Sequence, residues 1–375
     1  MRSVPLLATI LGTVALCLTA AATEWNVLRH QGRDYVSFEN VAEFYRFGEY
    51  SHANRTISLR SEHRTIRAQV GTSDIYINGV RFFTHLPLLE RANANLVSAL
   101  DVAKIIEPVL RPSRIENAQK VETVILDPGH GGTDQGTANR WGTEKGFALD
   151  VALAARNQLL RAGYKVEMTR SGDTGISLED RVEFANRFPN AVLVSIHFNS
   201  GSGGAGVESY ALAPENVPSN AAPSAEHHSA ANEAAPAQNP GNAQDSQNIA
   251  LTAAVHAAVL SRVTAYDRGI RHARFKVLRN VRIPALLLEA GFLNDPAEGE
   301  RIASPQYRQQ LGAAIAQGVQ NYNAAVNYRA TNTSFAVVRA NLPPHSRSIA
   351  DPLHVDSPPA ASAPETPSIS INGGE

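Results

Sequence analysis

The chain has 375 residues, 43% of them hydrophobic, and a formal net charge of −1. Its length allows roughly two or three domains of about 100–200 residues each. A net charge this close to zero leaves no basic footprint for nucleic-acid binding, so no nucleic-acid partner is expected.

Residues 1–22 are typical of a secretory signal peptide. Arg2 gives a short positive start, the segment from Val4 to Leu18 is almost wholly apolar, and small residues precede the expected cleavage site near Ala22. Cleavage there would remove Cys17, which is the only cysteine, so any metal must be held by His, Asp or Glu. An uncleaved anchor is the alternative. We expect an exported protein, in the periplasm or else extracellular or wall-associated, with no stable membrane insertion after cleavage.

Residues 23–115 predict a small α+β domain. Alternating apolar and polar residues indicate short strands, and Asn78–Gly79 between two strand-like runs is a strong hairpin signal. Ser37 and Ser98 are candidate N-caps of two short helices. The unit has no cluster of His, Asp and Glu at ligand spacing. It loosely resembles the small N-terminal domain, related to that of copper amine oxidases, found on secreted and cell-wall proteins, which implies a wall-binding or spacer role.

Residues 122–326 alternate predicted strands and helices. This pattern favours an α/β fold with a mostly parallel sheet and helices on both faces. Apolar runs at 124–126, 191–196 and 284–288 predict buried strands, and a shared apolar face predicts a helix over 144–162. Residues 213–247 are dominated by Ala, Pro, Asn and Ser, which predicts a flexible insertion. Residues 329–375 predict a disordered tail rich in Pro and Ser.

Four residues with useful chemistry lie at strand ends or at a helix start: His130, Glu144, His197 and Glu289. Crossover connections bring the carboxyl ends of parallel strands to one edge of the sheet, so these side chains can meet there. His130, His197 and Glu144 provide two imidazoles and one carboxylate, the ligand set of a catalytic zinc with an open position. Glu289 is the candidate general base. Its alternative is a buried carboxylate paired with an arginine such as Arg181.

Seven short motifs then carry a resemblance: Asp127–Gly132, Glu144–Lys145, Thr169–Asp173, Leu178–Arg181, Ser195–Asn199, Gly206–Glu208 and Leu288–Phe292. Their order resembles that of zinc-dependent N-acetylmuramoyl-L-alanine amidases of the type-3 amidase family. The resemblance implies one Zn²⁺ held by His130, Glu144 and His197, with Glu289 as the catalytic glutamate. It also implies peptidoglycan as the substrate. The bond cut would be the amide between N-acetylmuramic acid and the L-alanine of the stem peptide, hydrolysed by zinc-activated water.

Asp127, Arg181 and Asn199 are expected to support the ligands. Asp127 can accept a hydrogen bond from a ligand imidazole or can cap the turn, and the other two can equally form an ordinary ion pair or close a strand end. Asp134 and Glu208 are expected to be structural.

Residues 213–247 also bear on regulation. In some amidases of this family an inserted helix covers the zinc until a partner removes it. The prolines and weak amphipathic pattern of residues 213–247 argue against such a helix, and a protein activator is left open.

Two other functions compete with the amidase. A related zinc peptidase that cuts stem peptides would use the same ligands, because both reactions hydrolyse amides. A non-catalytic cell-wall-binding protein would be expected to lack one ligand or the base, and all four residues are present.

Overall fold

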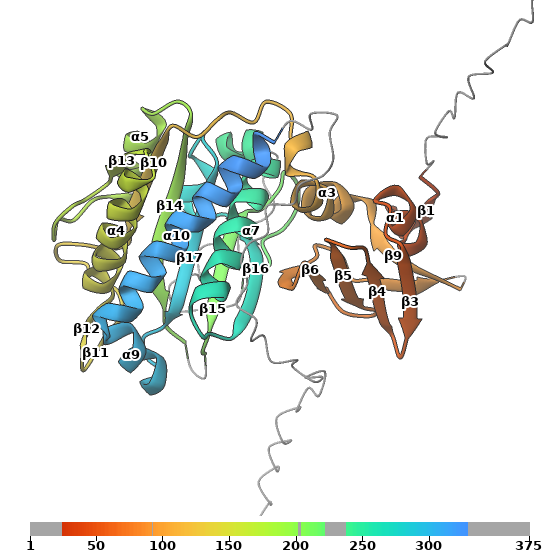
Figure 1. Ribbon diagram of the computed structural model, residues 1–375, viewed down its shortest axis with the longest axis horizontal. Helices are drawn as coiled ribbons and strands as arrows, with labels where there is room; N and C mark the ends of the chain where they lie inside the picture. The colour runs from red at the N-terminus through yellow and green to blue at the C-terminus, as the bar shows by residue number, and fades with distance from the viewer. Residues whose placement is uncertain (1–24, 92, 202–203, 222–237, 329–375) are drawn as a thin grey trace, which may run out of the picture. The chain divides into compact units, whose positions relative to one another are not determined.

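The computed structural model describes residues 25–91, 93–201, 204–221 and 238–328 (Figure 1). The expected signal peptide, the expected tail and residues 222–237 of the expected insertion lie outside the described residues. Among the helices in those four ranges, none is both long and apolar enough to cross a bilayer.

An eleven-stranded sheet runs through the described chain in the order β13-β10-β14-β17-β15-β16-β7-β6-β5-β4-β3. Its first four strands are mutually parallel: β13 (Lys165–Met168), β10 (Thr123–Pro128), β14 (Ala191–Asn199) and β17 (Ala285–Phe292). β15 (Val207–Leu212) runs antiparallel to β17, and β16 (Asp267–Ala273) runs parallel to β15. The expected mostly parallel α/β sheet is confirmed, with β15 as the point where the direction reverses.

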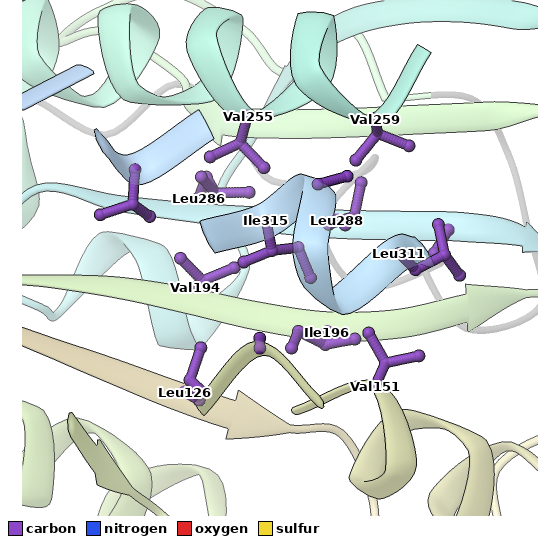
Figure 2. Packing of buried hydrophobic residues seen from close by; sticks show 14 of the residues in the cluster. Leu126, Val151, Val194, Ile196, Val255, Val259, Leu286, Leu288, Leu311 and Ile315 are labelled. Atoms are coloured by element: carbon purple, nitrogen blue, oxygen red, sulfur yellow. The ribbon is translucent and has the colours of Figure 1, made fainter. Parts of the chain in front are cut away.

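Helices cover both faces of the parallel strands. Alternate side chains of a strand point to opposite faces, and in these strands the side chains on both faces are apolar and buried. On one face Leu126, Val194 and Leu288 pack against α4 (Glu144–Arg161), α7 (Asp245–Arg262) and α10 (Pro305–Val326), as Figure 2 shows. On the other face Ile125 and Leu193 contact α5 (Leu178–Asn186) and α8 (Lys276–Arg279). Each fully buried leucine or isoleucine contributes about 1.5–3 kcal/mol to this packing.

Shorter elements connect these layers. The antiparallel pair β11 (Ala138–Asn139) and β12 (Gly142–Thr143) precedes α4, and α9 (Pro296–Ala303) follows β17. A 3-10 turn at Pro240–Gln244 leads directly into α7, which begins at Asp245. The expected flexible insertion over residues 213–247 is therefore wrong for its last residues, which already form regular structure. The first turn of α7 is obscured in the sequence by the Asn- and Gln-rich composition of residues 239–248.

The N-terminal segment, residues 25–115 and called the first unit below, contains the predicted hairpin and both predicted caps. Asn78 and Gly79 form the turn between β6 (Asp74–Ile77) and β7 (Val80–Phe83). The Ser37 hydroxyl accepts a hydrogen bond from the Asn40 amide at the start of α1 (Phe38–Phe44). The Ser98 hydroxyl caps α2 in the same way. The remaining elements of this unit are β1 (Val27–His30), β2 (Arg33–Ser37), β3 (Glu49–Ala53), β4 (Thr56–Arg60), β5 (Thr65–Gln69), β8 (Leu89–Arg91), β9 (Ala94–Ser98), α2 (Ala99–Asp101), a π-helical stretch (Val102–Ile106), α3 (Glu107–Leu110) and a 3-10 turn (Pro112–Arg114).

The first unit shares the eleven-stranded sheet with residues 122–326. β7 pairs in parallel with β16 through Phe82 and Ile270. Ile270 and Ala211 are buried in the same apolar cluster as Phe82 and Ile75. The first unit and residues 122–326 therefore share a sheet and a core.

Candidate metal and catalytic site

The loop after β10 places His130 at the carboxyl edge of the sheet. His130 has a φ of 58°, in the left-handed region where a non-glycine residue costs roughly 1–3 kcal/mol and must be held by its surroundings. Arg181 does this by donating from Nη1 to the Pro128 carbonyl at 2.8 Å and from Nη2 to the His130 carbonyl at 2.6 Å. Arg170, also buried, donates to the carbonyls of Pro128 and Gly129. Two arginines thus fix the backbone of this loop.

Three side chains converge beside the loop. His130 Nε2 lies 3.0 Å from Glu144 Oε1, and His197 Nδ1 lies 3.1 Å from the same oxygen. One nitrogen or oxygen from each of the three residues falls within 4.8 Å of the other two. Glu144 begins α4, whereas His197 lies near the end of β14. The sheet edge therefore brings together residues that are far apart in sequence.

Two glycines leave the space that these side chains occupy. A Cβ on Gly129 would lie 2.3 Å from Cε1 of the His197 ring. A Cβ on Gly136 would lie 2.5 Å from Glu144 Oε2 and 2.7 Å from His130 Cδ2, at a φ of 59°. Any larger residue at either position would displace an imidazole or the carboxylate.

The geometry and chemistry of this donor set fit a zinc ion. Ligand atoms around a tetrahedral zinc with bonds of about 2.0–2.1 Å lie about 3.3 Å apart, close to the 3.0 and 3.1 Å separations from Glu144 Oε1. Although His130 Nε2 is buried and lies 3.0 Å from Glu144 Oε1, the two atoms are not aligned as a regular hydrogen bond, as suits two atoms that can share a cation. The described site can therefore hold a metal ion.

His130 is oriented by Asp134, whose Oδ2 lies 2.8 Å from Nδ1 of the ring. Burial alone would lower the pKa of His130, but the carboxylates of Glu144 and Asp134 outweigh it and raise the pKa to about 9. A carboxylate on the second nitrogen of a ligand imidazole fixes its tautomer and ring orientation. Asp134 is expected from the sequence to be structural, so its contact with the His130 ring is missed there. The signal that could have found it is a carboxylate four residues after the histidine in a glycine-rich turn.

Glu144 is held as an anion. Its Oε1 accepts a hydrogen bond from the Phe198 amide at 3.1 Å, and its Oε2 accepts one from the Thr137 amide at 3.0 Å. Burial opposes ionisation, but the two imidazoles more than offset that effect and leave the pKa of Glu144 well below its usual value. The carboxylate is also at the positive end of a helix dipole.

Glu289 lies on β17 directly beside His197 of β14 in the parallel register. Its side chain is fully buried. Burial raises the pKa of Glu289 to about 8, since the opposing positive charge of His197 is countered by the negative charges of Glu144 and Glu208. Arg181, the alternative partner considered for Glu289, forms its 2.5 Å ion pair with Asp127 instead.

The Asp127 side chain supports the strand ends rather than a ligand ring, whereas Asn199 ties two strand ends together through its backbone. The buried Asp127 carboxylate accepts hydrogen bonds from Arg181, Thr169 and Ser195. The Asn199 carbonyl accepts one from the Leu293 amide at 3.0 Å, which ties the end of β14 to the loop after β17.

Comparison with known proteins identifies the family. The family model of N-acetylmuramoyl-L-alanine amidases matches residues 124–321. The sporulation-specific N-acetylmuramoyl-L-alanine amidase of Bacillus subtilis is 32% identical over 213 residues, which cover 56% of this chain and 71% of that protein. The chain belongs to the N-acetylmuramoyl-L-alanine amidase family.

Other relatives of this amidase cover the same region. AmiA of Escherichia coli, also an N-acetylmuramoyl-L-alanine amidase, is 32% identical over 219 residues, or 53% of this chain and 75% of AmiA. A crystal structure of an N-acetylmuramoyl-L-alanine amidase from Clostridium difficile 630 aligns with 54% of this chain and 97% of its own, at 33% identity and a TM-score of 0.43. Membership of this family confirms the prediction of an amidase that acts on peptidoglycan. None of these matches supports the two alternatives, a stem peptidase or a non-catalytic wall-binding protein.

Proposed function

We propose that the chain hydrolyses the amide between N-acetylmuramic acid and the L-alanine of the stem peptide, with one Zn²⁺ held by His130, Glu144 and His197. The observation that carries this proposal is the convergence of two imidazole nitrogens and one carboxylate oxygen within 4.8 Å of one another. Three protein ligands of this type leave a fourth position open. When bound there, zinc polarises a carbonyl and lowers the pKa of water to about 7.

Glu289 is the proposed general base and then the general acid. Its place beside His197 puts it at the same level of the sheet as a ligand. Because burial raises its pKa to about 8, the side chain can take a proton from the attacking water and return it to the leaving amine near neutral pH. The leaving amine becomes the free N-terminus of the stem peptide.

The remaining residues of the site keep this geometry fixed. Arg181 and Arg170 hold the main chain around His130, and Asp134 holds its imidazole. Asp127 keeps Arg181 in place through their buried ion pair. Fixed ligands matter because a displacement of about 1 Å at a catalytic group can cost about a hundredfold in rate.

The place of action follows from the substrate. Peptidoglycan lies outside the cytoplasmic membrane, so we propose that residues 1–22 direct export, to the periplasm or another wall-facing location. We assign the chemistry to residues 122–326. A protein activator, and any role of residues 213–247 in controlling access, stay predictions.

The proposal is tested by digesting purified peptidoglycan with the zinc-loaded protein, in parallel with a sample stripped of metal by a chelator. Mass spectrometry of the soluble products identifies the bond. We expect stem peptides with a free L-alanine N-terminus, lost on chelation and recovered when zinc is added back. Shortened stems still attached to the sugar would instead show a peptidase and contradict the proposal.

A further inference from the structure

At the candidate site, residues on four neighbouring strands, β14, β17, β15 and β16, form one continuous row of register partners. His197 of β14 is the register partner of Glu289 of β17, and Glu289 is the register partner of Glu208 of β15. Glu208 in turn faces Gly269 of β16. The proposed base therefore lies between a proposed zinc ligand and a second glutamate.

Glu208 is a fully buried carboxylate, and it faces another one. Residues directly opposite in an antiparallel pair have Cβ atoms about 4.5–5.5 Å apart, and like charges at that distance repel. Glu208 therefore needs a cation on its far side. Arg271 of β16 provides one by donating from Nε to Oε1 at 2.5 Å, and Arg268 Nε lies 3.6 Å from Oε2.

Arg271 is held by the first unit of the chain. Its guanidinium carbon lies 3.7 Å from the ring centroid of Phe83, at the end of β7. Its Nη1 donates to the carbonyl of Asn220 at 3.1 Å, and Asn220 Nδ2 donates to the carbonyl of Phe83 at 3.3 Å. The arginine is thus enclosed between an aromatic ring and a segment that is bonded to the same strand.

The contact between β7 and β16 is close-packed at this level. A Cβ on Gly269 would lie 2.9 Å from Cε2 of Phe83, at a φ of 92°. Asp267 Oδ2 accepts a hydrogen bond from the Arg81 amide at 3.0 Å, and Asp267 Oδ1 lies 3.0 Å from Nε2 of the buried His256. The first unit therefore contacts β16 through the backbone as well as through Phe83.

We propose that the first unit completes the catalytic assembly: Phe83 fixes Arg271, Arg271 fixes Glu208, and Glu208 fixes the surroundings of Glu289. Phe83, Arg271 and Glu208 are positioning residues, because they act through one another and do not touch the reacting atoms. The inference rests on the proposed role of Glu289. It gives residues 23–115 a part in the chemical step, beyond the wall-binding or spacer role expected from their sequence.

The test uses a soluble N-acetylmuramoyl peptide as substrate, so that binding to the insoluble wall does not enter the measurement. The variants Phe83→Leu, Arg271→Gln and Glu208→Gln are made in the full chain. Rates are expressed per folded, zinc-containing molecule, with folding followed by circular dichroism and zinc by atomic absorption. We expect kcat to fall about tenfold or more, with KM within about twofold, as for residues that orient catalytic groups.

The matched control is Phe44→Leu. Phe44 is also a partly buried ring of the first unit with an arginine over it, since the Arg111 guanidinium carbon lies 4.7 Å from its centroid. It does not belong to the chain of contacts that leads to Glu289. We expect kcat to stay near the unsubstituted value in Phe44→Leu. Phe83→Tyr keeps a ring over Arg271, so its kcat should also stay near the unsubstituted value, in contrast to Phe83→Leu.

Equal kcat values for Phe83→Leu, Arg271→Gln and the unsubstituted protein would overturn the inference, whatever their melting temperatures. A fall in kcat that is as large in Phe44→Leu would also overturn it, since that result would reflect general damage to the first unit. If the unsubstituted, zinc-loaded protein releases no product from this substrate, the proposed function itself fails, and this outcome is separate from the first two.

Discussion

His197 and Glu289 are register partners on the neighbouring parallel strands β14 and β17. Both strands are mostly apolar before this point, and each supplies one ionisable side chain at the same position along the sheet. The relative position of a proposed ligand and the proposed base is therefore set by backbone hydrogen bonds rather than by a flexible loop. Catalytic groups on rigid elements are held more precisely than groups on loops.

Replacing Asp134 by alanine should weaken zinc binding. His130 Nδ1 would lose its 2.8 Å partner, and loss of such a partner typically costs about 10–100-fold in metal affinity or activity. Competition with a chromophoric chelator measures the affinity. Asp134→Asn is the control, because its amide oxygen can still accept the ring proton. Equal zinc affinity in Asp134→Ala and the unsubstituted protein would show that the ring is held by other contacts.

Gly129→Ala should displace His197. The new Cβ would lie 2.3 Å from the ring, a distance at which one of the two groups has to move. We expect a loss of zinc affinity and a fall in kcat of about a hundredfold or more. Gly172→Ala is the matched control, because nothing lies within 4 Å of a Cβ at that position. Full zinc content and normal kcat in Gly129→Ala would contradict this close approach of Gly129 to the His197 ring.

Much of this site could be predicted because its residues follow directly from local patterns. His130 lies just beyond the end of one short apolar strand and His197 near the end of another, and crossover topology leads such strand ends to one edge. The resemblance to the family then points to the same residues. The predicted positions of the Asn78–Gly79 hairpin and of the Ser37 cap are also confirmed, because both depend on neighbouring residues only.

The rest depends on contacts between residues far apart in sequence. β16 has no clear signal in the sequence, since Asp267–Ala273 carries several charged or titratable residues among few apolar ones and is stabilised by its neighbours β15 and β7. The pairing of β7 with β16 likewise has no local signal. Glu208 reads as structural in the sequence, and its place opposite Glu289 emerges only from the register of β15.

Arg181→Met should destabilise the fold strongly. It would leave the buried Asp127 carboxylate without its cation, and breaking a buried pair in this way costs about 3–5 kcal/mol. The free energy of unfolding in urea measures the loss. The double variant Asp127→Asn with Arg181→Met removes both charges and should be clearly more stable than the single variant. If the two variants unfold at the same urea concentration, the ion pair does not stabilise the fold in this way.

The same pair predicts a dependence of stability on pH. Burial alone would raise the pKa of Asp127, but Arg181, Thr169 and Ser195 hold it below its usual value. A lowered carboxyl pKa contributes stability that is fully present above the unfolded value of about 3.9 and is lost as the pH falls through the folded value. The free energy difference between the unsubstituted protein and Asp127→Asn should therefore shrink below about pH 4. A difference that stays constant from about pH 6 to about pH 3 would contradict this assignment.

The most direct test of the proposed site compares zinc content with turnover in single variants of the four central residues. We expect His130→Ala, Glu144→Ala and His197→Ala to lose both bound zinc and the release of stem peptides. Glu289→Gln should keep one zinc per chain and lose about 10²–10⁴-fold in kcat, as expected for removal of a general base. A Glu289→Gln protein that binds zinc and still releases stem peptides at the unsubstituted rate would contradict the role of Glu289 as the base.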